Sequence, residues 1–372
     1  MEITLPLFPI RHQRIGGTES SIYNLAKGLH RIGTRLKLAR SRRDFLAPEF
    51  LAWLDGTNIE QSVYRSWGKR IAGRFLEETW FDLFDRSKTV LYPNYFLPPM
   101  RRHRAHRAVI IHDVQCKTYP QYFTYRKRIW FEANIARTLA HADALLFISQ
   151  FERQQTARFF GDAFLDRSHV IYTAIDWDRY GSGIVSEGVQ RLAARPFILT
   201  VAHQFPHKNL ETLIGAFAVL GARHPDLSLV MVGKPSLPIR AAADALLTPN
   251  TSSRVHFTGF VSDADLGHLY RNMQLFALPS RYEGFGMPAV EAMAFGKPTL
   301  LADGGALREV TLDKAAYLPL DATAGDWSDA LDGLLGKPGL GAADVADLKA
   351  RYSPEAAARL VTHALGEPPP AE

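Results

Sequence analysis

Two carboxylates around a glycine-rich turn form the most informative pattern in the sequence. Residues 283–298 read E-G-F-G-M-P-A-V-E-A-M-A-F-G-K-P, so that Glu283 precedes the turn and Glu291 follows it. The start of a helix binds anions because its first N–H groups are unpaired, and glycine lets a ligand approach the backbone. The stretch therefore predicts a phosphate site. Acids beside a phosphate are better suited to the hydroxyl groups of a sugar or ribose.

The residues around this pattern predict the elements that hold it. A β-rich run ends at Leu278, and Pro288 stands where proline is preferred, in the first turn of a helix. Gly296 is suited to cap that helix, and Pro298 prevents its continuation. We therefore expect a strand, a turn and a short helix over residues 288–295.

Strands and helices alternate along most of the chain, which indicates parallel α/β sheets. The pattern loosens between residues 174 and 195, and a second series starts at Pro196. We expect two domains joined by a linker, with ligands bound where the strands end. The predicted segments are an N-terminal domain (1–174), a linker (175–195), a C-terminal domain (196–350), a helix that packs back toward the first domain (351–366) and a disordered tail (367–372).

Composition restricts the class of protein. The chain has 372 residues, of which 47% are hydrophobic and 22% charged, values typical of a globular protein of two domains. Its single cysteine, Cys116, excludes an internal disulfide and favours a reducing cytosol. No apolar run reaches the ~18 residues of a membrane span, and the first residues lack the pattern of a signal peptide. We expect a cytoplasmic protein, peripheral on the inner face of the membrane at most.

Positive charge is concentrated in the first half. Residues 1–175 carry 27 Lys and Arg against 16 Asp and Glu (27 − 16 = +11), and the rest carry 17 against 22 (17 − 22 = −5). A concentration of positive charge of this kind indicates a surface that binds anions, which are nucleic acid, anionic lipid or a phosphorylated substrate. The aromatic run Tyr119–Tyr125 precedes Arg126, Lys127 and Arg128, and could stack on nucleobases or on sugars. We favour sugars and lipid phosphates, with no nucleic-acid partner.

The chain resembles the retaining glycosyltransferases of family 4, whose signature E-G-F-G-x-P-x-x-E-A-x-A-x-G-x-P (the EX7E motif) residues 283–298 match at every defined position. The resemblance implies the GT-B fold, in which two Rossmann-like domains face each other across a deep cleft. Further segments resemble the family: Ile15–Glu19 its glycine loop, His112-Asp113 its His-Asp pair, Phe147–Ser149 a strand end, His207–Leu210 its donor-phosphate motif and Asp303–Glu309 the segment after the signature.

The resemblance also implies roles for residues. Glu283 would hydrogen-bond the donor sugar, Glu291 the ribose, and Lys208 the departing diphosphate, together with the backbone at Phe285 and Gly286. His112 would lie close to the sugar as a hydrogen-bond donor or orienter. The expected catalytic residues are Glu283, His112 and Lys208, and the expected donor-binding residues are Gly16, Gly17, His203, Val261, Phe285, Gly286 and Glu291.

One position departs from the family. Many members have arginine five residues before the lysine, where this chain has His203. Histidine is only partly charged at pH 7 and cannot make a forked contact to phosphate. Either Lys208 acts with less help or another cation compensates, and Arg281 is a candidate.

No metal is expected. The pairs Asp176/Asp178 and Asp263/Asp265 lack a third ligand at suitable spacing. The motifs of dinucleotide-binding dehydrogenases and of P-loop kinases are missing as well. The resemblance implies a nucleotide diphosphate sugar as co-substrate, and no cofactor is expected.

These observations predict a retaining hexosyltransferase that moves a hexose or deoxyhexose onto a sugar hydroxyl of a lipid-linked polysaccharide or lipopolysaccharide intermediate. Mannose or rhamnose is favoured, with GDP-mannose ahead of UDP- and dTDP-sugars. Two alternatives stay open: a GT-B-like sugar epimerase or phosphorylase, and a non-catalytic module that binds sugar nucleotides or polyanions. The donor base, the acceptor, the linkage and the oligomeric state stay open too.

Overall fold

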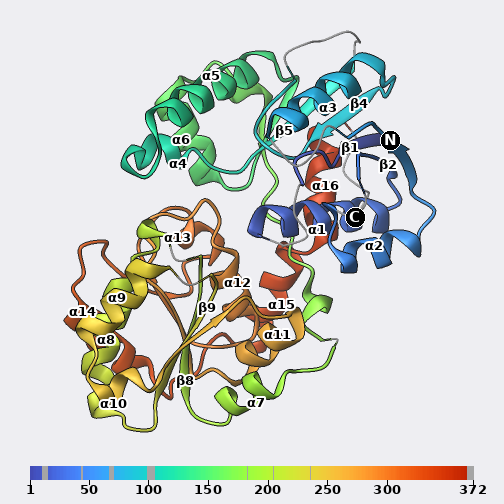
Figure 1. Cartoon of the computed structure of the whole chain (residues 1–372). Coiled ribbons are helices and arrows are strands. Elements are labelled where there is room, and N and C mark those ends of the chain that lie inside the picture. Colours follow the sequence, from blue (N-terminus) through green and yellow to red (C-terminus); the bar gives the residue numbers. More distant parts are fainter. Residues whose placement is uncertain are drawn as a thin grey trace. The chain divides into compact units, whose positions relative to one another are not determined.

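The computed structural model divides into two compact units (Figure 1). Unit 1 comprises Met1–Ile175 and Tyr352–Glu372, and unit 2 comprises Asp176–Arg351. The structure describes residues 1–10, 16–42, 45–66, 71–98, 105–181, 183–203, 205–234 and 236–366, and it leaves out the side chains of residues 71, 72 and 75. Each unit is described by itself below.

Within its described residues, unit 1 contains a seven-stranded parallel sheet in the order β3-β2-β1-β4-β5-β6-β7. The strands are β1 (Glu2–Pro6), β2 (Arg35–Arg40), β3 (Glu60–Val63), β4 (Thr89–Tyr92), β5 (His106–Ile111), β6 (Ala144–Phe147) and β7 (Ser168–Val170). The helices are α1 (Gly17–Arg31), α2 (Pro48–Asp55), α3 (Ile71–Phe84), α4 (Gln115–Thr118), α5 (Tyr125–His141), α6 (Gln150–Phe160) and the C-terminal α16 (Pro354–Ala364), with 3₁₀ turns η2 (Pro120–Tyr122) and η3 (Leu165–Arg167).

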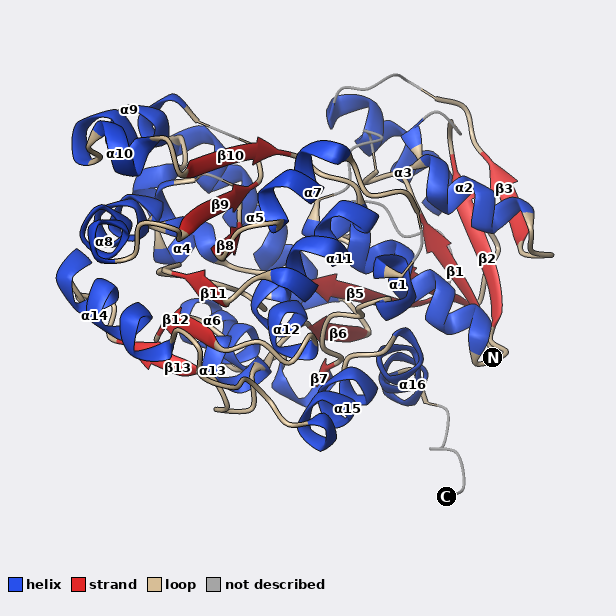
Figure 2. Cartoon of the chain, turned by 90° about the horizontal axis from the view of Figure 1, so that it is seen from below, coloured by secondary structure: helices blue, strands red, loops and turns tan. Residues whose placement is uncertain are grey.

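Helix α16 belongs to unit 1, where it lies beside α1 in Figures 1 and 2. Their approach is close because Gly28 of α1 has no side chain: a Cβ there would lie 2.0 Å from the carbonyl oxygen of Pro354. Ala357, Ala358 and Val361 of α16 are buried. The chain therefore leaves unit 1 after Ile175 and returns to it at Tyr352.

Unit 2 contains a six-stranded parallel sheet in its described part, in the order β10-β9-β8-β11-β12-β13 (Figure 2). The strands are β8 (Phe197–Val201), β9 (Ser228–Val232), β10 (Val255–Gly259), β11 (Leu275–Leu278), β12 (Thr299–Ala302) and β13 (Ala316–Leu318). The helices are α7 (Glu187–Ala193), α8 (Leu210–Arg223), α9 (Leu237–Leu246), α10 (Pro249–Ser252), α11 (Asp263–Asn272), α12 (Met287–Ala294), α13 (Leu307–Val310), α14 (Ala324–Leu334) and α15 (Ala342–Arg351), with 3₁₀ turns η4 (Trp177–Tyr180) and η5 (Pro206–Lys208).

Two apolar layers cover the two faces of the unit 2 sheet. One joins the sheet to α8, α9 and α14 through Phe217, Leu220 and Trp327. The other joins it to α11 and α12 through Tyr270 and Ala292. Alternate strand residues point to opposite faces, which is why short, uniformly apolar strands fit a sheet covered on both sides.

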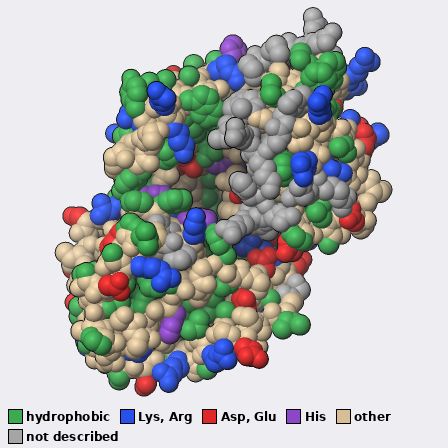
Figure 3. Space-filling view, viewed as in Figure 1, with side chains coloured by type: hydrophobic (Ala, Val, Ile, Leu, Met, Phe, Trp, Pro, Cys, Tyr) green, Lys and Arg blue, Asp and Glu red, His purple; other side chains and the backbone are tan. Residues whose placement is uncertain are grey.

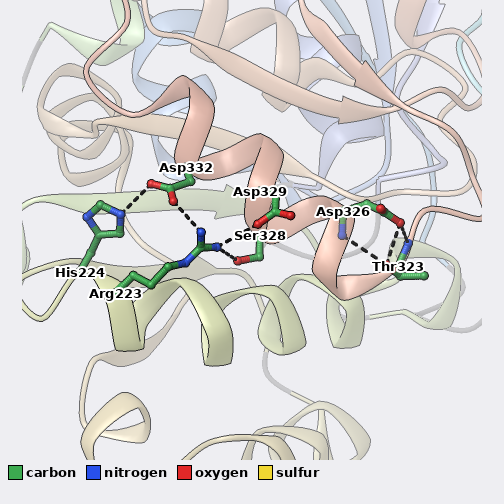
Figure 4. A network of polar contacts seen from close by, with 7 residues as sticks. All are labelled: Arg223, His224, Thr323, Asp326, Ser328, Asp329 and Asp332. Carbon is green, nitrogen blue, oxygen red and sulfur yellow. Dashed lines mark hydrogen bonds and ion pairs between the residues drawn. The ribbon is translucent and has the colours of Figure 1, made fainter.

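Helices α8 and α14 are also joined by polar contacts at their exposed ends (Figure 4). Arg223 pairs with Asp332 (2.8 Å) and Asp329 (3.2 Å), and a ring nitrogen of His224 lies 2.7 Å from Asp332. At the start of α14, the Thr323 hydroxyl accepts a hydrogen bond from the backbone N–H of Asp326.

The predicted linker differs from the structure. Residues 176–195 belong to unit 2 and carry η4 and α7. Tyr180 and Val189 are buried in the layer of α11 and α12, because these apolar side chains cover sheet residues such as Phe197. Of the glycines that suggested a linker, Gly181 caps η4 and Gly188 lies within α7, so neither prevents the segment from packing in unit 2. The predicted disordered tail, residues 367–372, lies outside the described residues, and among those that are described no helix is long and apolar enough to cross a membrane.

Candidate active site

In both parallel sheets the first strand lies inside the sheet, and later strands are added first on one side of it and then on the other. In unit 2 this switch lies between β8 and β11, and in unit 1 between β1 and β4. Loops that leave adjacent strands on opposite sides diverge there, so open α/β sheets bind ligands at this point. The loop after β8 leads to Lys208, and the loop after β11 leads to Glu283.

Lys208 and Glu283 form the central pair of this end of unit 2. The Lys208 Nζ atom lies 2.7 Å from Glu283 Oε1, and the side chains are 16% and 11% exposed. An ammonium and a carboxylate that are largely withdrawn from water need each other as partners. The structure thus brings together, from residues 75 positions apart, two of the three predicted catalytic side chains.

His207 lies next to this pair and is buried. Its pKa is lowered to about 4, first by burial and then by the positive charge of Lys208. The imidazole is therefore neutral near pH 7, and Lys208 supplies the charge of this turn.

The segment after β12 fixes the backbone of Glu283. The N–H of Ala306 donates to the carbonyl oxygen of Glu283 at 2.9 Å. Gly305 has φ +67°, and a Cβ there would lie 2.3 Å from that oxygen. Residues 303–309, which resemble the family in sequence, thus pack against the backbone of Glu283 and fix its position.

Helix α12 begins at the glycine turn. Gly286 is its N-cap with φ +87°, and a Cβ there would lie 2.5 Å from a methyl group of Leu307. Phe285 is buried, and Pro288 occupies the first turn as predicted. The first N–H groups of a helix have no partner within it, so the start of α12 can accept an anion.

Glu291 lies one turn further along α12 and is only 2% exposed. Its Oε2 accepts a hydrogen bond from the Tyr270 hydroxyl at 2.8 Å, and its Oε1 lies 3.1 Å from Arg179 Nη2. Neither partner was predicted. No local sequence signal marks Arg179, which lies in the segment taken for a linker, 112 residues before Glu291.

His203 lies among aromatic rings. The side chain is exposed, and its ring centroid lies 5.6 Å from that of Phe260 and 5.9 Å from that of Phe205. Arg281, the candidate to replace the family's arginine, approaches the turn of Lys208: its backbone N–H donates to His207 O at 2.8 Å, and its Nη2 lies 3.4 Å from Asn209 Oδ1.

Val261 lines a groove of about 700 Å³ within unit 2. The groove lies along the edge strand β10, with Phe257, Phe260, Arg240 and Asp265 also in its wall. Val261 thus lies beside Phe260 in the wall of this groove.

His112 follows β5 in unit 1, and it is buried. Its Nε2 lies 2.8 Å from the carbonyl oxygen of Pro93, which only accepts, so Nε2 carries the proton. Burial lowers the pKa of His112, although the Pro93 contact and Asp113 act against it. In this tautomer Nδ1 is the acceptor, and the role of His112 as a hydrogen-bond donor or orienter close to the sugar stays a prediction.

The glycine loop of unit 1 is partly described, since residues 11–15 lie outside the described residues. Gly16 is the N-cap of α1, and its N–H donates to Glu19 Oε2 at 3.1 Å. Gly17 begins the helix with open space where a side chain would be. A ligand could therefore approach the backbone at Gly17, whereas the N–H of Gly16 is already engaged.

Among the described residues no group of three His, Cys, Asp or Glu side chains is arranged to hold a metal. The independence from metal stays a prediction.

Solved structures share this architecture. Sucrose-phosphate synthase from Thermosynechococcus elongatus aligns over 98% of both chains with a TM-score of 0.75 and 19% identity. HepE from Anabaena, solved with UDP-glucose, aligns over 98% of this chain and 99% of its own with a TM-score of 0.72 and 18% identity. The two doubly wound units have the GT-B fold of glycosyltransferases.

Two family models match the chain. Residues 188–356 match the model described as "Glycosyl transferases group 1", and residues 15–179 match "Glycosyltransferase Family 4". The chain belongs to glycosyltransferase family 4. Among curated relatives, O-antigen chain mannosyltransferase B of Escherichia coli is 28% identical over 232 residues, which are 59% of this chain and 58% of that protein. The matches cover less than two thirds of the first relatives' own length.

Proposed function

We propose that the protein is a retaining glycosyltransferase that moves a hexose or deoxyhexose from a nucleotide diphosphate sugar to a sugar hydroxyl. The Lys208–Glu283 pair beside the start of α12 is the observation that carries this proposal. A cation and open helix N–H groups suit a diphosphate, and a fixed carboxylate suits sugar hydroxyls. Glu291 would receive the ribose.

The proposed reaction is a same-face displacement. The bond between the anomeric carbon and the diphosphate oxygen breaks, and the acceptor oxygen bonds to that carbon on the same face. The acceptor proton passes to the departing phosphate oxygen, so no protein base is required. Lys208 and the first N–H groups of α12 stabilise the negative charge that grows on the phosphate. Glu283 orients the sugar and stabilises positive charge on its ring.

Mannose is the favoured sugar, and rhamnose is the second choice. The relative named O-antigen chain mannosyltransferase B supports mannose, and with it GDP as the nucleotide. The fold neighbour solved with UDP-glucose supports a nucleotide sugar in general. The name of the first relative also supports an acceptor in O-antigen synthesis, which we take to be a lipid-linked polysaccharide or lipopolysaccharide intermediate.

An anionic membrane surface is the proposed partner of unit 1. Residues 121–130 expose Tyr122, Tyr125 (72% exposed), Ile129 and Trp130 together with Arg126 and Lys127. Hydrophobic and basic side chains lie side by side over α4 and α5 in Figure 3. Cations in the first turn of a helix are unfavourable unless an anion is near. Aromatic rings with cations suit the boundary between headgroups and acyl chains.

Transfer from a panel of GDP-, UDP- and dTDP-sugars to a lipid-linked acceptor tests the activity. Lys208→Ala and Glu283→Gln are each expected to lower the rate by about 100- to 1,000-fold, as the loss of a preorganised transition-state contact does. Lys314→Ala removes an exposed ion pair with Asp344 and is the matched control. Near wild-type rates in both site variants would contradict the assignment.

Separate measurements test the retaining stereochemistry and the alternative functions. NMR of the product should show the anomeric configuration of the donor, and inversion would refute the retaining mechanism. Phosphate-dependent cleavage would indicate a phosphorylase, and conversion of the donor to an isomer without acceptor would indicate an epimerase. Binding of sugar nucleotides without any turnover would indicate a non-catalytic module.

Flotation with liposomes tests the membrane surface. Binding to anionic vesicles is expected to fall with added salt and in the double variant Tyr125→Ser/Ile129→Ser. Val219→Ser, at an apolar residue of α8 that is 50% exposed, is the control. Equal binding to zwitterionic and anionic vesicles, or no binding, would contradict the proposal.

A further inference from the structure

Glu291 is held inside the protein by residues from two other elements. Arg179 comes from η4 and Tyr270 from α11, and each occupies one oxygen of the carboxylate. The Glu291 side chain is 2% exposed and that of Arg179 is 16% exposed. A buried carboxylate without a cation is strongly unfavourable, so Arg179 is the charge that allows Glu291 to be there.

Arg179 is itself fixed. Its guanidinium lies over the ring of Tyr180 at 4.6 Å and hydrogen-bonds the Tyr180 hydroxyl. Its Nε lies 3.9 Å from Asp263 Oδ1. These contacts on the face and along the edge of the planar Arg179 guanidinium fix its orientation. The guanidinium in turn fixes the orientation of the Glu291 carboxylate.

Tyr270 fixes the other oxygen. Its ring is fully buried and stacks on Phe295, with centroids 5.4 Å apart. Burial, followed by the charge of Glu291, raises the pKa of Tyr270 well above 10. The hydroxyl therefore keeps its proton and can only donate it to the carboxylate at this contact.

We propose that Arg179 and Tyr270 are positioning residues of the donor site, which aim the free lone pairs of Glu291 at the vicinal hydroxyls of the ribose. A carboxylate accepts about four hydrogen bonds, and Arg179, Tyr270 and the Tyr180 hydroxyl do not use them all. The inference rests on the proposed function, because that function places the ribose at Glu291. It adds that the orientation of Glu291 is set by two residues which need not touch the donor.

Discrimination between ribose and deoxyribose tests this inference. Calorimetric titration would compare GDP and UDP with their 2′-deoxy forms, on the full chain. We expect the wild type to prefer the ribonucleotide by about tenfold, as one lost polar contact predicts. Tyr270→Phe and Arg179→Gln should reduce the preference to within about twofold, and Arg179→Lys should restore part of it.

A matched control separates positioning from folding. Arg271 Nη2 also holds η4, through the carbonyl oxygen of Tyr180 at 2.6 Å, and no contact joins it to Glu291 in the described part of the chain. Arg271→Gln should leave the preference unchanged. Melting temperatures show which variants fold, and Tyr270→Phe, which removes only an oxygen, keeps the test available if Arg179→Gln unfolds.

Two results would overturn the inference. In one, Tyr270→Phe and folded Arg179 variants weaken both nucleotides equally, so that the preference persists. In the other, the wild type itself shows no preference, and Glu291 does not receive the ribose. Failure of the proposed function is seen separately, as the absence of sugar transfer by the wild type.

Discussion

The carboxyl ends of the two sheets share one topology and differ in their chemistry. In unit 2 the groups there are charged and paired, as in Lys208–Glu283 and Arg179–Glu291. In unit 1 the corresponding group is a neutral histidine, His112, whose Nε2 is bound to a backbone carbonyl. We propose that the difference reflects two tasks, with a ligand of fixed charge bound by unit 2 and neutral hydroxyl groups bound by unit 1.

The contrast extends to how each group is held. Glu283 is fixed by backbone packing at Gly305, and Glu291 by side chains from two other elements. His112 is fixed by its hydrogen bond to Pro93, by a ring contact with Tyr95 and by burial. Changes in unit 2 should therefore affect nucleotide binding and transfer together, whereas changes at His112 should affect transfer alone.

The largest effect is expected from Gly305→Ala. The new Cβ would lie 2.3 Å from the carbonyl oxygen of Glu283 in a left-handed conformation, so the backbone of Glu283 must move. We expect sugar transfer to fall by about 100-fold and unit 2 to lose about 2–4 kcal/mol of stability. Steady-state kinetics and urea unfolding measure both.

Gly336→Ala is the matched control for that change. Gly336 has a similar φ of +74°, and a Cβ there meets nothing within 4 Å. It should cost about 1 kcal/mol for the conformation and leave transfer unchanged. If both variants lowered transfer equally, packing against Glu283 would not be the cause.

The next effect is expected at His112. His112→Phe removes the acceptor and leaves the Pro93 carbonyl without its donor. We expect kcat/KM to fall by about 10- to 100-fold, nucleotide affinity to stay constant and His112→Gln to recover part of the loss. An equal fall in nucleotide affinity would contradict the proposal that the two units bind different parts of the substrates.

Acid should destabilise the protein through His207. Its pKa is about 4 in the folded protein and about 6.5 when unfolded, so the unfolded chain binds the proton more readily. Stability present above pH 6.5 should decrease by about 1–3 kcal/mol as pH falls to 4. Urea unfolding at several pH values should show a smaller decrease for His207→Gln. An identical pH dependence in both proteins would contradict the buried, neutral histidine.

The smallest effect is expected at the polar contacts of α8 and α14 (Figure 4). Arg223 is 41% exposed and its partner Asp329 is 79% exposed, so water competes for the charges. Arg223→Ala should change stability by no more than about 1 kcal/mol and leave transfer unchanged. Thermal melting at low and high salt measures it. A larger loss would mean that exposed charges matter as much here as the buried pairs of the site.

Most of the fold could be predicted from the sequence. Apolar runs indicated strands such as β5, β6 and β11 because parallel strands are covered on both faces, whereas the polar β3 and the short β7 and β13 carry no such signal. The turn before α12 was marked by Gly286 and Pro288. The linker was wrong because Gly181 and Gly188 interrupt a pattern without showing whether Tyr180 is buried.

The candidate site could be predicted only where its residues lie in one segment. Glu283, Phe285, Gly286 and Glu291 follow from a single motif, and their roles stay predictions. Arg179 and Tyr270 could not be found, since their meaning depends on contacts with a helix far along the chain. The role of His112 as a donor or orienter stays a prediction, and the sequence could not show that its Nε2 contacts the carbonyl of Pro93, on a neighbouring strand end.

The closure of unit 1 by α16 determines the order in which the chain can fold. The N–H of Ile175 donates to the carbonyl oxygen of Tyr352 at 2.8 Å, so unit 2 is an insertion between adjacent points of unit 1. During synthesis, all of unit 2 leaves the ribosome before α16 can reach the groove at Gly28. Unit 2 can therefore fold while α1 still exposes the apolar surface that α16 later covers, and such surface makes a partly folded chain prone to aggregation.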